Sequence, residues 1–169
     1  FQQPSLCAPT CLSMIFERRG TKIDQLQIAK DLHTKIPSFR EEEIPIHLTT
    51  VTDLATAGTD INIFRGEQIH ALFDKFRLKL ETTVHYIKDI PDLPLFLAEH
   101  LQKGNDALVN YRDTLGKEKA GLGHYALVSE VDVSAREIEL CDPWQGNESF
   151  YKVSADELAA EIDTIDPQG

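Results

Sequence analysis

The spacing of apolar residues changes partway along this chain of 169 residues, and that change limits the fold more than any other feature. Up to about residue 103 the apolar residues recur at helical spacing, which predicts helices over 9–19, 24–33, 50–57, 67–76 and 90–103. Short runs typical of strands follow at 107–111, 125–131, 137–140 and 150–153, separated by polar turns. Helices followed by such strands predict an α+β fold with a small antiparallel sheet.

Glycines and a capping motif mark where several of these helices begin or end. Gly20 and Gly104 directly follow two of the predicted helices. Glycine enters the left-handed backbone region easily, and this makes it typical of the position just after a helix. Ser154 and Glu157 have the spacing of a capping box, so we expect a last helix from Ser154 through Ile162.

Composition and charge exclude several classes of protein. With 41% hydrophobic and 27% charged residues, the chain can bury the core of one compact domain, which we expect to span residues 1–169. A net charge of -11 repels phosphate backbones and anionic lipid surfaces, so nucleic acid is not an expected partner. Apolar stretches such as 93–98 fall far short of the roughly 20 residues of a membrane span, which predicts a soluble domain.

The first residue of the chain bears on the location of the protein. Because the chain begins at Phe1, we expect a trimmed N-terminus, and both a cytoplasmic and an exported location stay open.

Three cysteines are an odd number, which favours reduced thiols over a disulfide framework. Cys7 and Cys11 are one helical turn apart, but no second Cys/His pair follows at a zinc-like interval, so no metal is expected. We interpret Cys11 and Cys141 as small buried apolar residues.

Three residues together have the pattern of a nucleophilic acyl-transfer site. Cys7 lies at the start of the first predicted helix, where the positive end of the helix dipole favours a thiolate. His124 follows Gly123 at the start of a strand, a place from which Nδ1 or Nε2 can act as a general base and then as a general acid. Asp142 comes about one hairpin later, close enough to hold the second ring nitrogen.

Such a site also needs donors for the oxyanion of the tetrahedral intermediate. The backbone N–H of Cys7 can supply one donor, and the side-chain amide of Gln2 or Gln3 can supply the other. Trp144, two residues after Asp142, either shields the His124 and Asp142 pair from water or belongs to the core.

Three blocks of sequence resemble the papain-like cysteine peptidases, and within them the bacterial C39-like peptidases of the bacteriocin-processing type. The blocks are QQPSLCAPTCLSMI at 2–15, GHYALV at 123–128 and DPW at 142–144. The resemblance implies a papain-like fold in which a helical half carrying the nucleophile helix packs on a small antiparallel sheet. It also implies cysteine-dependent hydrolysis of a peptide or amide bond by Cys7, His124 and Asp142, with no cofactor and with a peptide or protein as substrate.

The chain departs from the family pattern at two positions. Ala8 stands where the family usually has glycine, and Phe1 stands where it usually has the oxyanion-hole glutamine. Two alternatives therefore stay open beside the peptidase. One is an acyltransferase or transpeptidase, since residues 4–7 resemble the phytochelatin-synthase pattern, and the other is a catalytically degenerate domain that binds a peptide. The stretch 38–83 is expected to set substrate selectivity, and the sequence predicts no oligomeric state.

Overall fold

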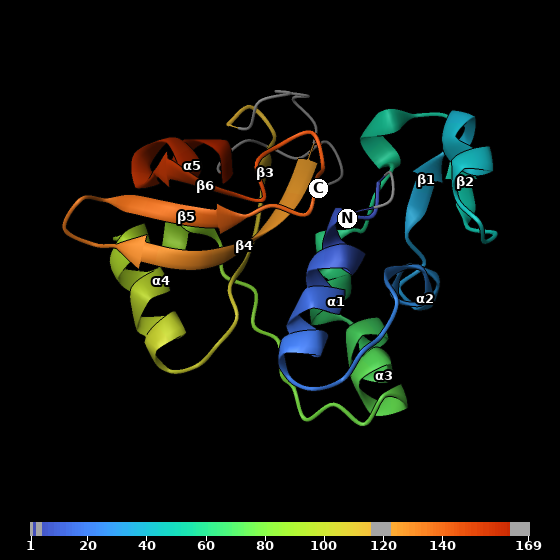
Figure 1. Cartoon of the computed structure of the whole chain (residues 1–169), viewed down its shortest axis with the longest axis horizontal. Helices are drawn as coiled ribbons and strands as arrows, with labels where there is room; N and C mark the ends of the chain where they lie inside the picture. Colours follow the sequence, from blue (N-terminus) through green and yellow to red (C-terminus); the bar gives the residue numbers. More distant parts are fainter. Residues whose placement is uncertain (1, 3–4, 116–122, 163–169) are drawn as a thin grey trace. The chain divides into compact units, whose positions relative to one another are not determined.

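The computed structural model describes residue 2 and residues 5–115 and 123–162 (Figure 1). The described residues form two compact units: the N-terminal unit, up to residue 84, and the C-terminal unit, from residue 85 onward. Helices and a small antiparallel sheet are both present, which confirms the predicted α+β class. The single domain predicted over residues 1–169 stays a prediction.

The N-terminal unit is mainly helical. Its helices are α1 (Cys7–Arg18), α2 (Gln25–Asp31) and α3 (Glu67–Lys75), together with the short 3-10 helices η1 (Ser38–Glu43), η2 (Leu54–Thr56) and η3 (Ile61–Arg65). Its strands are β1 (Lys35–Pro37) and β2 (Thr49–Val51). The predicted helices at 9–19, 24–33 and 67–76 are therefore present, with ends that differ by at most two residues.

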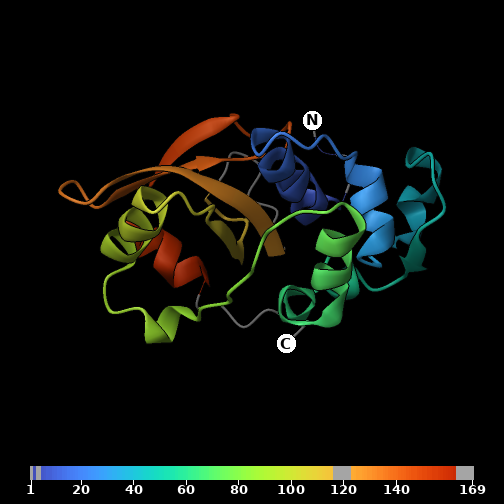
Figure 2. The same cartoon turned by 90° about the horizontal axis from the view of Figure 1, so that it is seen from below.

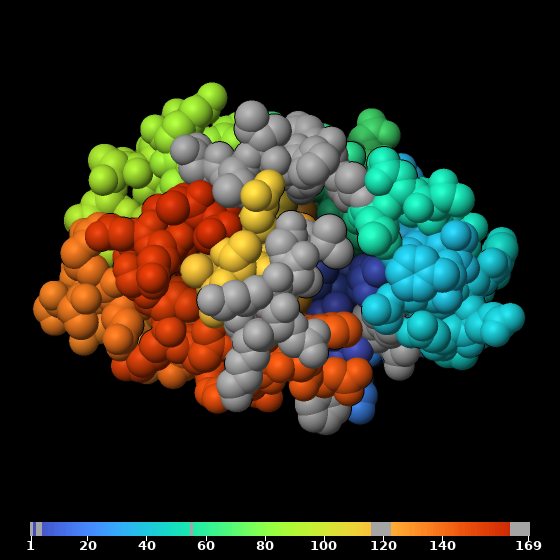
Figure 3. All heavy atoms as spheres, turned by 90° about the horizontal axis from the view of Figure 1, so that it is seen from above, coloured from blue at the N-terminus to red at the C-terminus, as the bar shows by residue number. Residues whose placement is uncertain are grey.

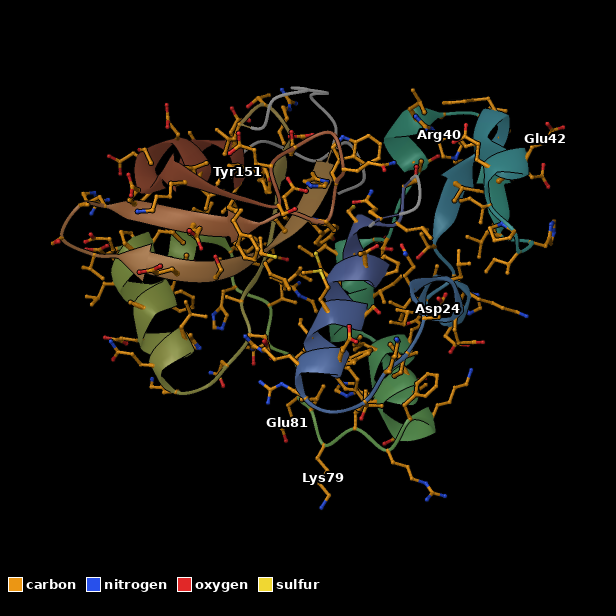
Figure 4. The ribbon with its side chains drawn as sticks, viewed as in Figure 1. Asp24, Arg40, Glu42, Lys79, Glu81 and Tyr151 are labelled. Carbon is orange, nitrogen blue, oxygen red and sulfur yellow. The ribbon has the colours of Figure 1, made fainter. Side chains whose placement is uncertain are left out.

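Side chains fix how the helices of this unit begin and pack. Gly20 has φ +86°, the left-handed conformation expected just after α1. Asp24, labelled in Figure 4, caps α2 because its carboxylate accepts the backbone N–H of Leu26 at 2.7 Å. Phe16 of α1 meets Phe73 of α3 edge to face, with 6.1 Å between ring centroids. The ring contact joins α1 to α3 within the unit.

The helix predicted over 50–57 is wrong. Residues 49–51 instead form β2, which pairs in parallel with β1 in the register Lys35 with Thr49 through Pro37 with Val51. Only Leu54–Thr56 turns helically, as η2. The consecutive β-branched residues at 49–52 favour an extended backbone. This preference determines the local structure, although the few apolar residues there have helical spacing.

The C-terminal unit is a four-stranded antiparallel meander with two helices. The strands are β3 (Leu108–Arg112), β4 (Gly123–Asp132), β5 (Glu137–Cys141) and β6 (Phe150–Ser154), and they lie side by side in that order. The helices are α4 (Leu93–Gln102) and α5 (Ala155–Ile162), with the 3-10 helix η4 (Ile87–Asp89) before them. All four predicted strands and the helices expected near 90–103 and 154–162 are confirmed.

One face of the meander packs against both helices. A single buried cluster combines α4 (Leu93, Leu97) and α5 (Leu158) with inward residues of the strands, including Ile138 and Leu140. Figure 2 shows α4 and α5 on the same side of the strands, and Figure 3 shows the red β6–α5 segment beside the yellow β3 segment. The side chains of the sheet therefore alternate between this core and an outer charged face.

Local signals at the ends of these helices are also present. Gly104 has φ +78° after α4, as expected of a glycine stop. The backbone N–H of Glu157 donates to Ser154 Oγ at 3.4 Å, which is the first half of the predicted capping box. In the described part of the chain, no helix combines the length and the apolar character needed to cross a bilayer.

Candidate active site

Cys7 is the first residue of α1, and its side chain is buried. No side chain caps this end of the helix, and the first turn holds no acidic residue. The first helical hydrogen bond runs from the N–H of Thr10 to the carbonyl of Leu6, so the N–H groups of Cys7 and Ala8 lie before it. The positive end of the helix dipole therefore lies beside the Cys7 side chain, with no capping side chain or acidic residue to offset it.

The residues before Cys7 include the two candidate oxyanion donors. Gln2 is buried, and its Oε1 atom has no hydrogen-bond partner among the described residues. Gln3 lies outside the described residues. Ser5 has φ +61°, so the chain enters α1 through a left-handed residue that is not glycine. The choice of Gln2 or Gln3 as donor stays a prediction.

The structure brings His124 and Asp142 together within the C-terminal unit. His124 is the second residue of β4, and Asp142 directly follows β5, its antiparallel neighbour. His124 Nε2 lies 2.8 Å from Asp142 Oδ1, and the two side chains are 8% and 0% exposed. Cys7 belongs to the N-terminal unit, so the three predicted residues are divided between the two units.

Four donors surround the carboxylate of Asp142. Oδ1 accepts His124 Nε2 and the backbone N–H of Trp144, both at 2.8 Å. Oδ2 accepts the amide of Asn147 at 2.9 Å and the hydroxyl of Tyr151 at 3.0 Å. Burial alone would raise the pKa of Asp142, but the hydrogen bond and charge of His124, with the donors from Trp144 and Asn147, lower it below its usual range.

An ionised Asp142 determines which tautomer His124 adopts. A carboxylate can only accept hydrogen bonds, so the proton of the neutral imidazole must be on Nε2. The nitrogen that can take up a proton in the neutral ring is therefore Nδ1. The sequence left both nitrogens open for this role, and the hydrogen-bond network of Asp142 assigns it to Nδ1.

Two tyrosines extend the network and were missed by the sequence analysis. Tyr111 lies directly opposite His124 in the pairing of β3 with β4, and its ring meets the imidazole edge to face at 5.6 Å. The hydroxyls of Tyr111 and Tyr151 lie 2.8 Å apart. Both tyrosines were interpreted only as parts of strands, and Asn147 was not singled out. The contact of Tyr111 with His124 depends on the register of β3 with β4, which apolar spacing alone does not give.

The remaining cysteines agree with their interpretation as buried apolar residues. Cys11 and Cys141 are buried, and neither is in a disulfide. Burial, and to a smaller extent the charge of Asp142, raise the pKa of the Cys141 thiol, which keeps it protonated at neutral pH. Within residues 5–115 and 123–162 and at residue 2, no group of three or more His, Cys, Asp and Glu side chains could hold a metal ion.

Comparison with known proteins gives no match of any kind: no protein-family model, no curated protein sequence and no solved structure matches this chain. The residues and their geometry are therefore the basis for inferring a function.

Proposed function

We propose that this chain is a cysteine-dependent hydrolase of peptide or amide bonds, with a papain-like arrangement of the C39-like type. Cys7 is the nucleophile, His124 is the general base and acid, and Asp142 orients the imidazole. The observation that carries the proposal is the buried pair of His124 and Asp142, whose four-donor network leaves Nδ1 as the basic nitrogen. The uncapped helix end at Cys7 supports it.

The proposed reaction has two halves joined by a thioester. His124 Nδ1 takes the proton of the Cys7 thiol, and the thiolate attacks the carbonyl carbon of the scissile amide. The backbone N–H of Cys7 and the amide of Gln2 or Gln3 stabilise the oxyanion. The imidazolium then gives its proton to the leaving amine, and the C–N bond breaks. In the second half, Nδ1 removes a proton from water, which attacks the thioester. The C–S bond then breaks, the carboxylic acid leaves, and the imidazolium returns its proton to the Cys7 sulfur.

Asp142 does not take part in proton transfer in this scheme. Its carboxylate stays ionised throughout, holds the Nε2 proton and stabilises the imidazolium that forms after Nδ1 is protonated. The donors from Asn147 and Tyr151 compensate this buried negative charge while the imidazole is neutral.

The first test is alkylation of the native chain with iodoacetamide at about pH 7, followed by intact mass spectrometry and peptide mapping. We expect one rapid adduct, on Cys7, because the proposed base His124 activates this thiol, whereas Cys11 is fully buried and the raised pKa of Cys141 keeps it a thiol. Cys7→Ala should abolish the rapid adduct, and His124→Ala should slow it by about tenfold or more. Cys141→Ala is the matched control and should leave the rate unchanged.

A second measurement separates hydrolysis from the alternatives. A fluorogenic peptide library with added amines should yield carboxylic acids, whereas amide products would indicate an acyltransferase. Labelling of Cys7 that is slow and indifferent to His124→Ala would contradict the proposal and would favour a peptide-binding domain without catalysis.

A further inference from the structure

Tyr111 and Tyr151 both pack in or against an apolar cluster, where phenylalanine would be the better residue if packing were the only role of the side chain. Tyr111 is 2% exposed and belongs to the apolar cluster between the sheet and the helices. Tyr151, labelled in Figure 4, comes from β6 and packs against the same cluster. A buried hydroxyl costs free energy unless it is hydrogen-bonded. Both hydroxyls take part in hydrogen bonds that lead to Asp142.

The chemistry of the groups determines the direction of these hydrogen bonds. Asp142 Oδ2 can only accept, so Tyr151 must donate its one hydroxyl proton to the carboxylate. Tyr151 then has no proton left for Tyr111, and the 2.8 Å hydrogen bond between the hydroxyls must be donated by Tyr111. The result is a chain of hydrogen bonds, here called the relay, in which Tyr111 donates to Tyr151 and Tyr151 donates to Asp142. The same carboxylate also accepts the hydrogen bond from His124 Nε2.

Both phenols stay protonated through the neutral range. Burial raises the pKa of Tyr111, and the neighbouring Tyr151 raises it further. Burial also raises the pKa of Tyr151, with a contribution from the charge of Asp142. The titratable groups that act on this network come from all four strands or follow them directly. They are Asp113 after β3, His124 on β4, Asp142 after β5 and Tyr151 on β6.

We propose that Tyr151 and Tyr111 are positioning residues that act on His124 through Asp142. Their relay fixes the orientation and the ionised state of the carboxylate, which in turn keeps the proton of the imidazole on Nε2 and leaves Nδ1 as the base. The effect on turnover rests on the proposed function, but the effect on the imidazole does not.

The test is nitrogen-15 NMR of the histidine side chains in the full chain. His124→Gln identifies the His124 resonances among those of the six histidines. We expect the Nε2–H tautomer and a slowly exchanging Nε2 proton in the wild type. Tyr151→Phe keeps the ring and removes the donor, and we expect it to accelerate exchange of this proton by about tenfold, the effect of one charge-assisted hydrogen bond. Tyr111→Phe should act in the same direction and less strongly.

A matched control and a second variant complete the experiment. Tyr86→Phe, at an exposed tyrosine, is the matched control and should leave the His124 resonances unchanged. If Tyr151→Phe does not fold, Tyr111→Phe provides the test, since it leaves the donor to Asp142 in place. Wild-type tautomer and exchange in both variants would overturn the proposal and assign the tyrosines to packing alone.

Turnover provides a second readout wherever a substrate has been found. Loss of the Tyr151 donor raises the pKa of Asp142, so the acid limb of the pH–rate profile should move to higher pH. We expect kcat to fall and KM to stay the same, because the relay acts on the base and not on the substrate. An inert Cys7 combined with altered His124 resonances would leave the relay standing and contradict only the proposed function.

Discussion

Asp142 is a charged side chain held in the interior of the C-terminal unit by donors from four other residues. Two of them, His124 and Trp144, bind Oδ1, and the other two, Asn147 and Tyr151, bind Oδ2. The complete set of donors compensates the free energy lost when the carboxylate leaves water. Removal of any one donor leaves a buried charge less well compensated, so the residue is sensitive to each neighbour.

This arrangement predicts a loss of stability in acid that depends on Asp142. Its pKa is lower in the folded chain than in the unfolded chain, so its stabilising contribution is complete above the unfolded value of about 3.9 and is lost as the pH falls through the folded value. We expect the free energy of unfolding in urea to fall on acidification below about pH 4, and to fall less in Asp142→Asn. The exposed Asp74→Asn is the control, and an acid response in Asp142→Asn equal to that of the wild type would contradict the prediction.

The sequence predicts a residue of the candidate site only where its side-chain chemistry and its position in the chain are enough to identify it. His124 and Asp142 stand out because imidazole and carboxylate occur one hairpin apart, and the structure joins them. Asn147, Tyr111 and Tyr151 do not stand out, because their contact with the pair depends on strand register and on the turn after β5. Apolar periodicity indicates which face a residue occupies, but it does not indicate its partner on the next strand.

At the scale of elements, helices and strands with several turns or clear alternation were predicted well. The meander followed from four apolar runs with polar turns between them, and α1 followed from its apolar stripe and from Gly20. The parallel pair of β1 and β2 could not be predicted, because each strand has only three residues and their partnership joins segments separated by η1. Short strands depend on tertiary pairing more than on their own sequence.

The start of α2 gives a prediction at this scale. Asp24 accepts the N–H of Leu26 and leaves the helix with one fewer unsatisfied donor. We expect Asp24→Ala to lower the free energy of unfolding by about 1 kcal/mol, and Asp24→Asn to lower it by much less, since asparagine caps helices nearly as well. Urea unfolding followed by far-ultraviolet circular dichroism measures both. An equal loss in the two variants would indicate that the negative charge matters more than the cap.

At the scale of the whole chain, the net charge of -11 is concentrated in part on the outer face of the meander. Glu130 lies opposite Glu139, and Asp132 lies opposite Glu137, so two cross-strand pairs carry like charges. Lys152 compensates one of these carboxylates through an ion pair of 2.7 Å with Glu137. Like charges placed directly opposite each other destabilise a sheet, so repulsion on this face lowers the free energy of unfolding.

Salt should therefore stabilise the chain. Raising sodium chloride from about 0.05 M to about 0.5 M shortens the screening length and weakens the repulsion, so we expect the urea midpoint to rise. The rise should be smaller in the double variant Glu130→Gln with Asp132→Asn. Chloride is the appropriate salt, because sulfate also strengthens apolar burial. A midpoint that falls with salt in the wild type would mean that attractive ion pairs such as that of Lys152 outweigh the repulsion.

The meander has a consequence for the order in which the site is made. Its four strands are neighbours in space in the order in which they occur in the chain, and the network from Tyr111 to Tyr151 lies within them. Each strand pair has low contact order, so the imidazole and its partners assemble by successive hairpin closures without a crossover from a distant segment. During synthesis from the N-terminus, every group that holds His124 is available once β6 has left the ribosome, long after Cys7 has appeared. Cys7, the proposed nucleophile, is therefore made first, and His124, the proposed base, acquires its full set of partners last.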